Sequence, residues 1–185
     1  DPSVGGLQVP GGYLDRPVSV SSFEDYLKCP FLYYGRYILN LREEDELGLE
    51  ADARARGKVL HAVLEQLIAE EIGTEKKFAS IATEAHVLEK VRAVVKEQGL
   101  PGLYRHPSLL EKAVKNIETQ ALIWRNWELE EREKHPLVKP IAVEEPMELV
   151  LFSDTDHAIK LQGVIDRVNT DGSHGIVVDY KFGGA

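Results

Sequence analysis

The middle of the chain carries a helical pattern of apolar residues. In the segment RARGKVLHAVLEQLIAEE, apolar positions recur three and four residues apart and therefore fall on one side of a helix. These positions are Val59, Leu60, Val63, Leu64, Leu67 and Ile68. His61 lies at the edge of this stripe, and Glu65 lies one turn further along on its polar side. The pattern predicts an amphipathic helix with a histidine and a glutamate at the border of its buried face.

Helical patterns also flank this segment. Before it, SVSSFEDYL predicts a helix that begins with a capping box of Ser21 and Glu24 and stops before Pro30, and FLYYGRYILNL predicts a second helix. After it, two further helices are expected at about 79–98 and 107–134, separated by the breaker run GLPGLYRHP.

From Pro140 the pattern becomes extended. IAVEEPMELVLF, HAIKLQGVIDRV and GIVVDYKF predict three strands joined by turns at SDTD and NTDGSH. Helices followed by an antiparallel meander predict an α+β domain, with the helical part packed on a mixed sheet that the meander leads. We expect a linker or arm at 1–18 and one domain at 19–185, with its helical part at about 19–135 and its meander at about 139–182.

Composition and charge narrow the class of protein. The 185 residues are 43% hydrophobic, which is typical of a soluble globular domain, and no apolar stretch or export signal predicts a membrane partner or secretion. The net charge of −9 argues against a free-standing nucleic-acid binder. The single cysteine, Cys29, can form neither an internal disulfide nor a structural metal site by itself, so we expect a cytoplasmic protein.

Two carboxylates and a lysine lie on the last two predicted strands. Side chains alternate along a strand, so Asp179 and Lys181 share one face and Tyr180 points to the other. Asp166 lies on the preceding strand, which the short turn makes a neighbour. Such carboxylates hold Mg²⁺, and a lysine beside the metal assists phosphodiester hydrolysis. A second interpretation stays open, in which Asp179 and Lys181 form a surface ion pair and both Asp166 and Arg167 are solvated.

The order of the motifs resembles the RecB/AddB branch of the PD-(D/E)XK nuclease superfamily. The motifs are GxxxHxxxE, EEP, GVIDRV and VVDYK, and the resemblance runs from about Val18 to Phe182. It implies a restriction-endonuclease-like core and a metal-dependent DNA exonuclease domain of a bacterial helicase-nuclease that processes double-strand breaks for recombinational repair. It also implies Mg²⁺ or Mn²⁺ as cofactor, linear or single-stranded DNA ends as substrate, and a helicase/nuclease subunit or a linked helicase domain as partner.

The resemblance further implies roles for individual residues. His61, Asp166, Asp179 and the backbone carbonyl of Tyr180 are the implied metal ligands, and Lys181 is the implied catalytic lysine beside the two aspartates.

The residues around this set have alternatives. His61 is either a ligand or a packing residue at the helix edge, and Glu65 is either a partner that supports His61 or an exposed helix acid. Glu144 and Glu145 alternate in direction, so only one of them can face the site.

Cys29 has a role only in a longer protein. The family pattern places one cysteine in this Cys-Pro context and three more after the nuclease core, where together they hold a 4Fe–4S cluster. The later cysteines, a QxxxY helix and the last core strand do not appear before Ala185. We therefore expect a C-terminally truncated chain, with Cys29 as an iron–sulfur ligand in the full-length protein and no cluster in these residues.

Two further alternatives remain. The chain is either an active nuclease or a non-catalytic module that keeps the nuclease fold to bind a DNA strand or a partner protein. The aromatic run of Tyr26, Phe31, Tyr33, Tyr34 and Tyr37 either stacks on bases or packs in the core, and its helical spacing favours the core. Core packing is also expected for Trp124 and Trp127.

Overall fold

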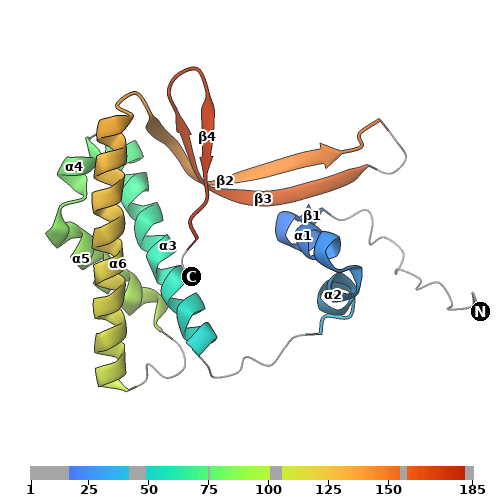
Figure 1. The fold of residues 1–185 in the computed structure, drawn as a ribbon, viewed down its shortest axis with the longest axis horizontal. Helices are drawn as coiled ribbons and strands as arrows, with labels where there is room; N and C mark the ends of the chain where they lie inside the picture. Colours follow the sequence, from blue (N-terminus) through green and yellow to red (C-terminus); the bar gives the residue numbers. More distant parts are fainter. Residues whose placement is uncertain (1–16, 42–48, 75, 101–105, 155–157, 182–185) are drawn as a thin grey trace, which may run out of the picture. The chain divides into compact units, whose positions relative to one another are not determined.

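The computed structural model describes residues 17–41, 49–74, 76–100, 106–154 and 158–181. Its helices are α1 (Val20–Lys28), α2 (Pro30–Tyr33), α3 (Leu49–Thr74), α4 (Phe78–Ile81), α5 (Glu84–Gln98) and α6 (Pro107–Lys134), with one π-helical turn, η1 (Tyr34–Ile38). Its strands are β1 (Val18–Ser19), β2 (Lys139–Leu151), β3 (Ile159–Thr170) and β4 (Gly175–Val178). Figure 1 shows these elements, and the expected α+β class is confirmed. Most of the predicted arm, residues 1–16, lies outside the described residues.

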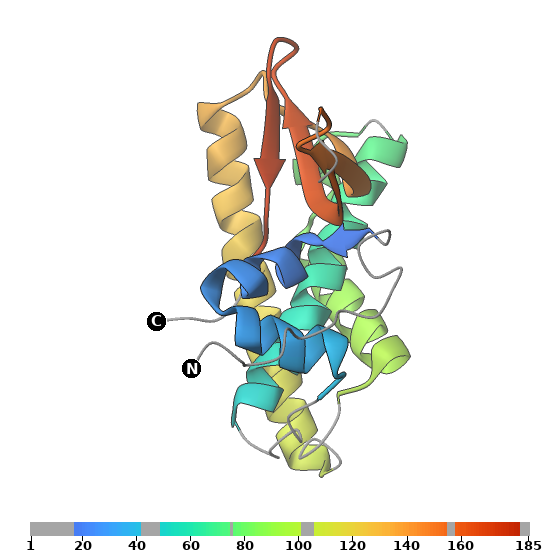
Figure 2. The same cartoon turned by 90° about the vertical axis from the view of Figure 1, so that its right-hand side faces the viewer.

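The strands form a mixed sheet. Its order is β1-β3-β2, and β4 pairs with β3. β1 runs parallel to β3. β4 runs antiparallel to β3 with Arg167 opposite Val178, and Figure 2 shows the hairpin that joins β3 to β4. The third predicted strand is shorter than expected, because β4 ends at Val178 and residues 179–181 continue outside the sheet.

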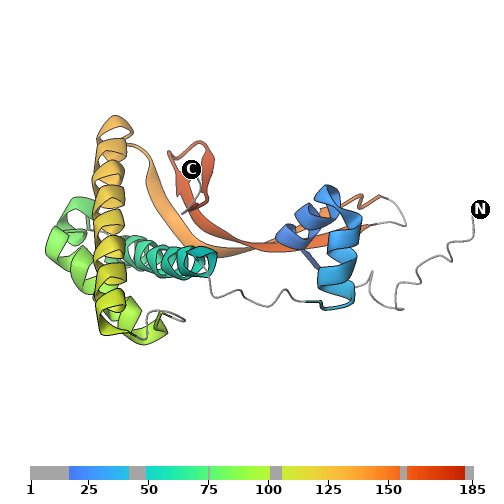
Figure 3. The ribbon, with the colours of Figure 1, turned by 60° about the horizontal axis from the view of Figure 1, so that its bottom comes forward.

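The chain divides into two compact units, and β2 and β3 contribute residues to both. The first unit comprises residues 1–44 and 146–164, and the second comprises residues 45–145 and 165–185. Within the first unit, α1 and α2 lie side by side, as Figure 3 shows.

Two helix starts differ from the sequence prediction. The Ser19 hydroxyl accepts a hydrogen bond from the Ser22 backbone N–H (3.1 Å), so Ser19, and not Ser21, caps α1. Ser19 still has extended backbone geometry because it belongs to β1. The helix expected at 79–98 is interrupted as well, because Ala82 leaves helical geometry and the Thr83 hydroxyl caps a new helix.

The aromatic run is only partly packed. The ring of Tyr33 contacts those of Tyr26 and Tyr37, with centroids 5.6 and 5.2 Å apart. Phe31, however, is 81% exposed and Tyr26 is 48% exposed. The expectation of core packing is therefore wrong for these two residues, because α1 and α2 are too short to enclose rings on several sides.

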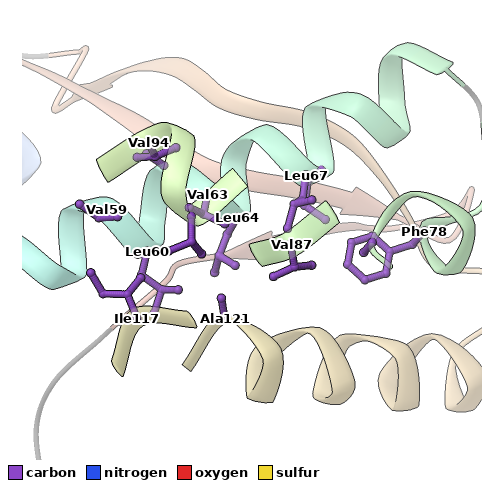
Figure 4. Close-up of a cluster of buried hydrophobic side chains, with 14 residues drawn as sticks. Val59, Leu60, Val63, Leu64, Leu67, Phe78, Val87, Val94, Ile117 and Ala121 are labelled. Atoms are coloured by element: carbon purple, nitrogen blue, oxygen red, sulfur yellow. The ribbon is translucent and has the colours of Figure 1, made fainter. Parts of the chain in front are cut away.

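The hydrophobic core lies in the second unit, where α3, α5 and α6 pack against one another. The predicted apolar stripe of α3 is confirmed, since all its members are buried, and Figure 4 shows several of them facing α5 and α6. Trp124 packs against this core, with its ring edge-to-face to Phe78 at 5.8 Å, whereas Trp127 is half exposed. Among the described helices, none is long and apolar enough to cross a membrane.

Truncating one core side chain of α3, that of Leu64, tests this packing. Leu64 is fully buried, so we expect Leu64→Ala to lower the free energy of unfolding by about 2–5 kcal/mol through lost burial and the cavity left behind. Ile123→Ala, at a position 63% exposed on α6, is the control and should change it little. Urea denaturation followed by circular dichroism measures both, and equal losses would contradict the described core.

Candidate active site

α3 supplies two side chains of the candidate site. His61 and Glu65 lie one helical turn apart, and both are half buried at the border of the apolar stripe. Their neighbours Leu60 and Leu64 are fully buried in the helical core. The core therefore fixes the rotation of α3 and leaves the imidazole and the carboxylate at its edge.

β3 brings a carboxylate to the imidazole. Asp166 Oδ2 lies 3.1 Å from His61 Nε2 and accepts a hydrogen bond of 2.9 Å from the Tyr180 backbone N–H. The Tyr180 ring lies edge-to-face to the His61 ring, with centroids 5.7 Å apart. Residues from α3, β3 and the segment after β4 thus meet at one point of the second unit.

β2 supplies a further carboxylate. Of the two adjacent glutamates, Glu144 faces the imidazole, with Oε1 3.6 Å from His61 Nε2, while Glu145 is exposed. One ligand atom from each of His61, Glu65 and Glu144 falls in a cluster in which every pair is within 4.8 Å. Strand alternation alone does not select between the two glutamates, so only the structure identifies Glu144.

The carboxylates of this cluster repel one another. Burial raises the pKa of the Glu65 carboxyl, and the Glu144 carboxylate raises it further, while His61 lowers it. Glu144 Oε1 is buried and has no hydrogen-bond partner in the described part of the chain. Within that part, no lysine or arginine forms an ion pair with Glu65, Glu144 or Asp166.

This donor set fits a divalent cation. Carboxylate oxygens suit Mg²⁺ and Mn²⁺, an imidazole nitrogen is a common ligand of transition metals, and a cation would satisfy the buried oxygen of Glu144. Among the described residues, His61, Glu65 and Glu144 form the group close enough to hold such an ion, and Asp166 contacts His61 without joining that group.

Asp179 and Lys181 pair with each other. Lys181 Nζ lies 3.2 Å from Asp179 Oδ2, and both side chains are exposed. Among the described residues, the Asp179 carboxylate does not join the ligand cluster around His61. Tyr180 lies between them in the sequence, and its backbone N–H donates a hydrogen bond to Asp166. Asp179 and Lys181 therefore flank a residue that contacts the site.

Cys29 lies in the first unit with an exposed thiol.

A buried ion pair supports the site from the opposite face of β3. Arg167 follows Asp166 in the strand, and its guanidinium donates two hydrogen bonds to the Glu128 carboxylate of α6, at 2.9 and 2.7 Å. It also donates to Asn169 at 2.6 Å and to the Tyr180 hydroxyl at 3.4 Å. Both charged side chains are nearly inaccessible, at 6% and 3% exposure.

The ion pair continues into a network. Arg132 donates to Glu128 at 2.8 Å, forms a bidentate pair with Glu71 of α3, and lies 4.5 Å from the centre of the Phe78 ring. Burial by itself would lower the pKa of Arg167, but the hydrogen bonds and charge of Glu128 outweigh burial and raise it. The network therefore ties β3 to both α6 and α3.

The sequence patterns do not identify this network. The interpretation that treats Arg167 as a solvated residue is wrong, because its guanidinium is buried against Glu128. The available signal is alternation: adjacent strand residues point to opposite faces, so an arginine beside a site aspartate must face the other layer of the fold.

The chain is similar to known nucleases. A family model described as the PD-(D/E)XK nuclease superfamily matches residues 17–185. A protein of Acetivibrio thermocellus, named as a subunit of an ATP-dependent helicase/deoxyribonuclease, is 27% identical over 194 residues, covering 90% of this chain and 15% of the relative. A protein of Streptococcus mutans serotype c with the same name is 31% identical over 172 residues, covering 91% of this chain and 14% of the relative. The chain thus spans about a seventh of the length of these curated relatives.

Removing one charge from the buried pair tests its structural role. We expect Glu128→Gln to lower the free energy of unfolding by about 3–5 kcal/mol, because Arg167 would stay buried without a counter-charge. Glu131→Gln, three residues further along α6, removes the acid of an ion pair with the exposed Lys134 and should leave stability nearly unchanged. Chemical denaturation measures both variants, and similar small effects would contradict the role of the pair.

Proposed function

Because the chain belongs to the PD-(D/E)XK nuclease superfamily, we propose that it is the metal-dependent deoxyribonuclease domain of a bacterial helicase-nuclease. Its reaction is the hydrolysis of phosphodiester bonds, as an exonuclease acting on DNA ends during double-strand-break processing. The single observation that carries this proposal is the cluster of His61, Glu65 and Glu144, with Asp166 Oδ2 3.1 Å from the same imidazole and no lysine or arginine to neutralise the carboxylates within the described part of the chain.

The residues have complementary tasks in this reaction. His61 and Asp166 would hold the cation, with Asp179 and the Tyr180 carbonyl as further ligands of the proposed set, and Glu65 would support His61. A Mg²⁺ or Mn²⁺ held there would supply Lewis-acid chemistry, polarising a phosphoryl group and lowering the pKa of a bound water. Lys181 orients the attacking water and stabilises the negative charge that develops on the phosphoryl oxygens.

The longer protein supplies the remaining parts. The relatives are named as helicase/deoxyribonuclease subunits, so the proposed partner is a helicase, either as a separate subunit or as a linked domain. Cys29 is proposed as an iron–sulfur ligand only in the full-length protein. The cytoplasm is the proposed compartment, since its reducing conditions suit a free thiol.

Replacing the lysine tests the proposed chemistry. We expect Lys181→Ala to reduce cleavage of linear DNA at least about 100-fold in Mg²⁺ or Mn²⁺, because the developing charge loses its stabilising partner. Lys134→Ala is the control, since it removes an exposed lysine of α6. Release of nucleotides from end-labelled DNA measures the rate. Cleavage by Lys181→Ala at the wild-type rate would contradict the mechanism, and a wild-type chain that never cleaves DNA would support a non-catalytic module.

Metal binding is tested separately by thermal unfolding. We expect Mn²⁺ to raise the melting temperature, since an ion that binds only the folded state stabilises it by about 2.7 kcal/mol at 100 times its Kd. Asp166→Asn should abolish this shift, whereas Asp154→Asn, which changes an exposed aspartate just after β2, should retain it. An equal shift in Asp166→Asn would contradict the assignment of Asp166 as a ligand.

A further inference from the structure

Glu144 has an unusual backbone for a strand residue. Its φ is 49°, in the left-handed region that a glutamate seldom adopts, although it lies inside β2. Residues 142–144 are all half buried in succession, so the alternation of β2 is broken at this point. Val143 packs against the helical core and Glu144 still faces His61. Such backbone conformations persist where the surrounding structure holds them, often at functional sites.

One carboxylate oxygen of Glu144 lies in an unfavourable environment, although 39% of the side chain is exposed. Its Oε1 is buried without a hydrogen-bond partner among the described residues, and the 3.6 Å to His61 Nε2 is too long for a hydrogen bond. The Glu65 carboxylate lies in the same cluster and repels it. Neighbouring Glu145 carries the same charge but is exposed, so it has none of these features.

The distances suit coordination better than a direct contact. Ligand bonds of about 2.1 Å at right angles put neighbouring ligand atoms about 3 Å apart. Glu144 Oε1 lies 3.6 Å from His61 Nε2, and the ligand atoms of His61, Glu65 and Glu144 all lie within 4.8 Å of one another, so the Glu144 carboxylate lies near the separation expected beside a coordinated imidazole.

We propose that Glu144 is a direct ligand of the divalent cation, alongside His61. This inference rests on the proposed function and adds to it a residue from β2. The strained backbone at Glu144 serves to direct its carboxylate toward His61, and the ion satisfies the oxygen that the protein leaves without a partner.

Direct measurement of Mn²⁺ binding tests the proposal. The free Mn²⁺ signal in electron paramagnetic resonance gives the affinity for the full chain and for Glu144→Gln, Glu145→Gln and Asp166→Asn. We expect Glu144→Gln to weaken binding at least about tenfold, since even outer-shell partners of metal ligands have effects of that size. Glu145→Gln makes the same change of charge one residue away and should leave the affinity unchanged.

The melting temperature of the metal-free protein is the control for folding. Glu144→Gln keeps the shape of the side chain and removes repulsion with Glu65, so the metal-free variant should melt no lower than the wild type. Its melting temperature should also respond less to Mn²⁺ than that of the wild type.

The outcomes separate the two proposals. Wild-type affinity in Glu144→Gln together with weak binding by Asp166→Asn would overturn the role of Glu144 and leave the nuclease assignment standing. Equal weakening by Glu144→Gln and Glu145→Gln would also overturn it, because general electrostatics would then explain the effect. A wild-type chain that binds no Mn²⁺ would overturn both.

Discussion

The buried ion pair between Arg167 and Glu128 is the constraint on which the site depends. A charge this inaccessible is tolerated only when its partner stays in place, so β3 is held in one position and one rotation against α6. Asp166 precedes Arg167 and necessarily points to the other face of the strand. Anchoring the arginine therefore directs the aspartate toward His61, which the hydrophobic core has placed at the border of α3.

Tyr180 extends this support past the end of β4. Its hydroxyl accepts a hydrogen bond from Arg167, its backbone N–H donates to Asp166, and its ring lies edge-to-face to Trp124 as well as to His61. One residue thus joins the ion pair on one side of β3 to the ligand cluster on the other. Asp179 and Lys181 flank it and gain a fixed point of attachment, although both side chains are exposed.

Negative charge has a different consequence at this site than for the chain as a whole. A net charge of −9 is unfavourable for a free-standing DNA binder, yet the carboxylates of Glu65, Glu144 and Asp166 gather around a single imidazole. Such a cluster attracts divalent cations. In the proposed helicase-nuclease, basic surfaces of other parts of the protein would deliver the DNA strand.

Features that depend on local order along the chain could be predicted without the structure. The apolar period of α3, the succession of helices and then strands, and the ordered motifs around His61, Asp166 and Lys181 identified the α+β class and the superfamily, and the structure and the family match confirm both. The choice of Glu144 over Glu145 and the pairing of Arg167 with Glu128 emerged only from the folded chain. These depend on contacts between residues far apart in the chain, and neither alternation nor propensity encodes which distant side chain will complete a buried charge.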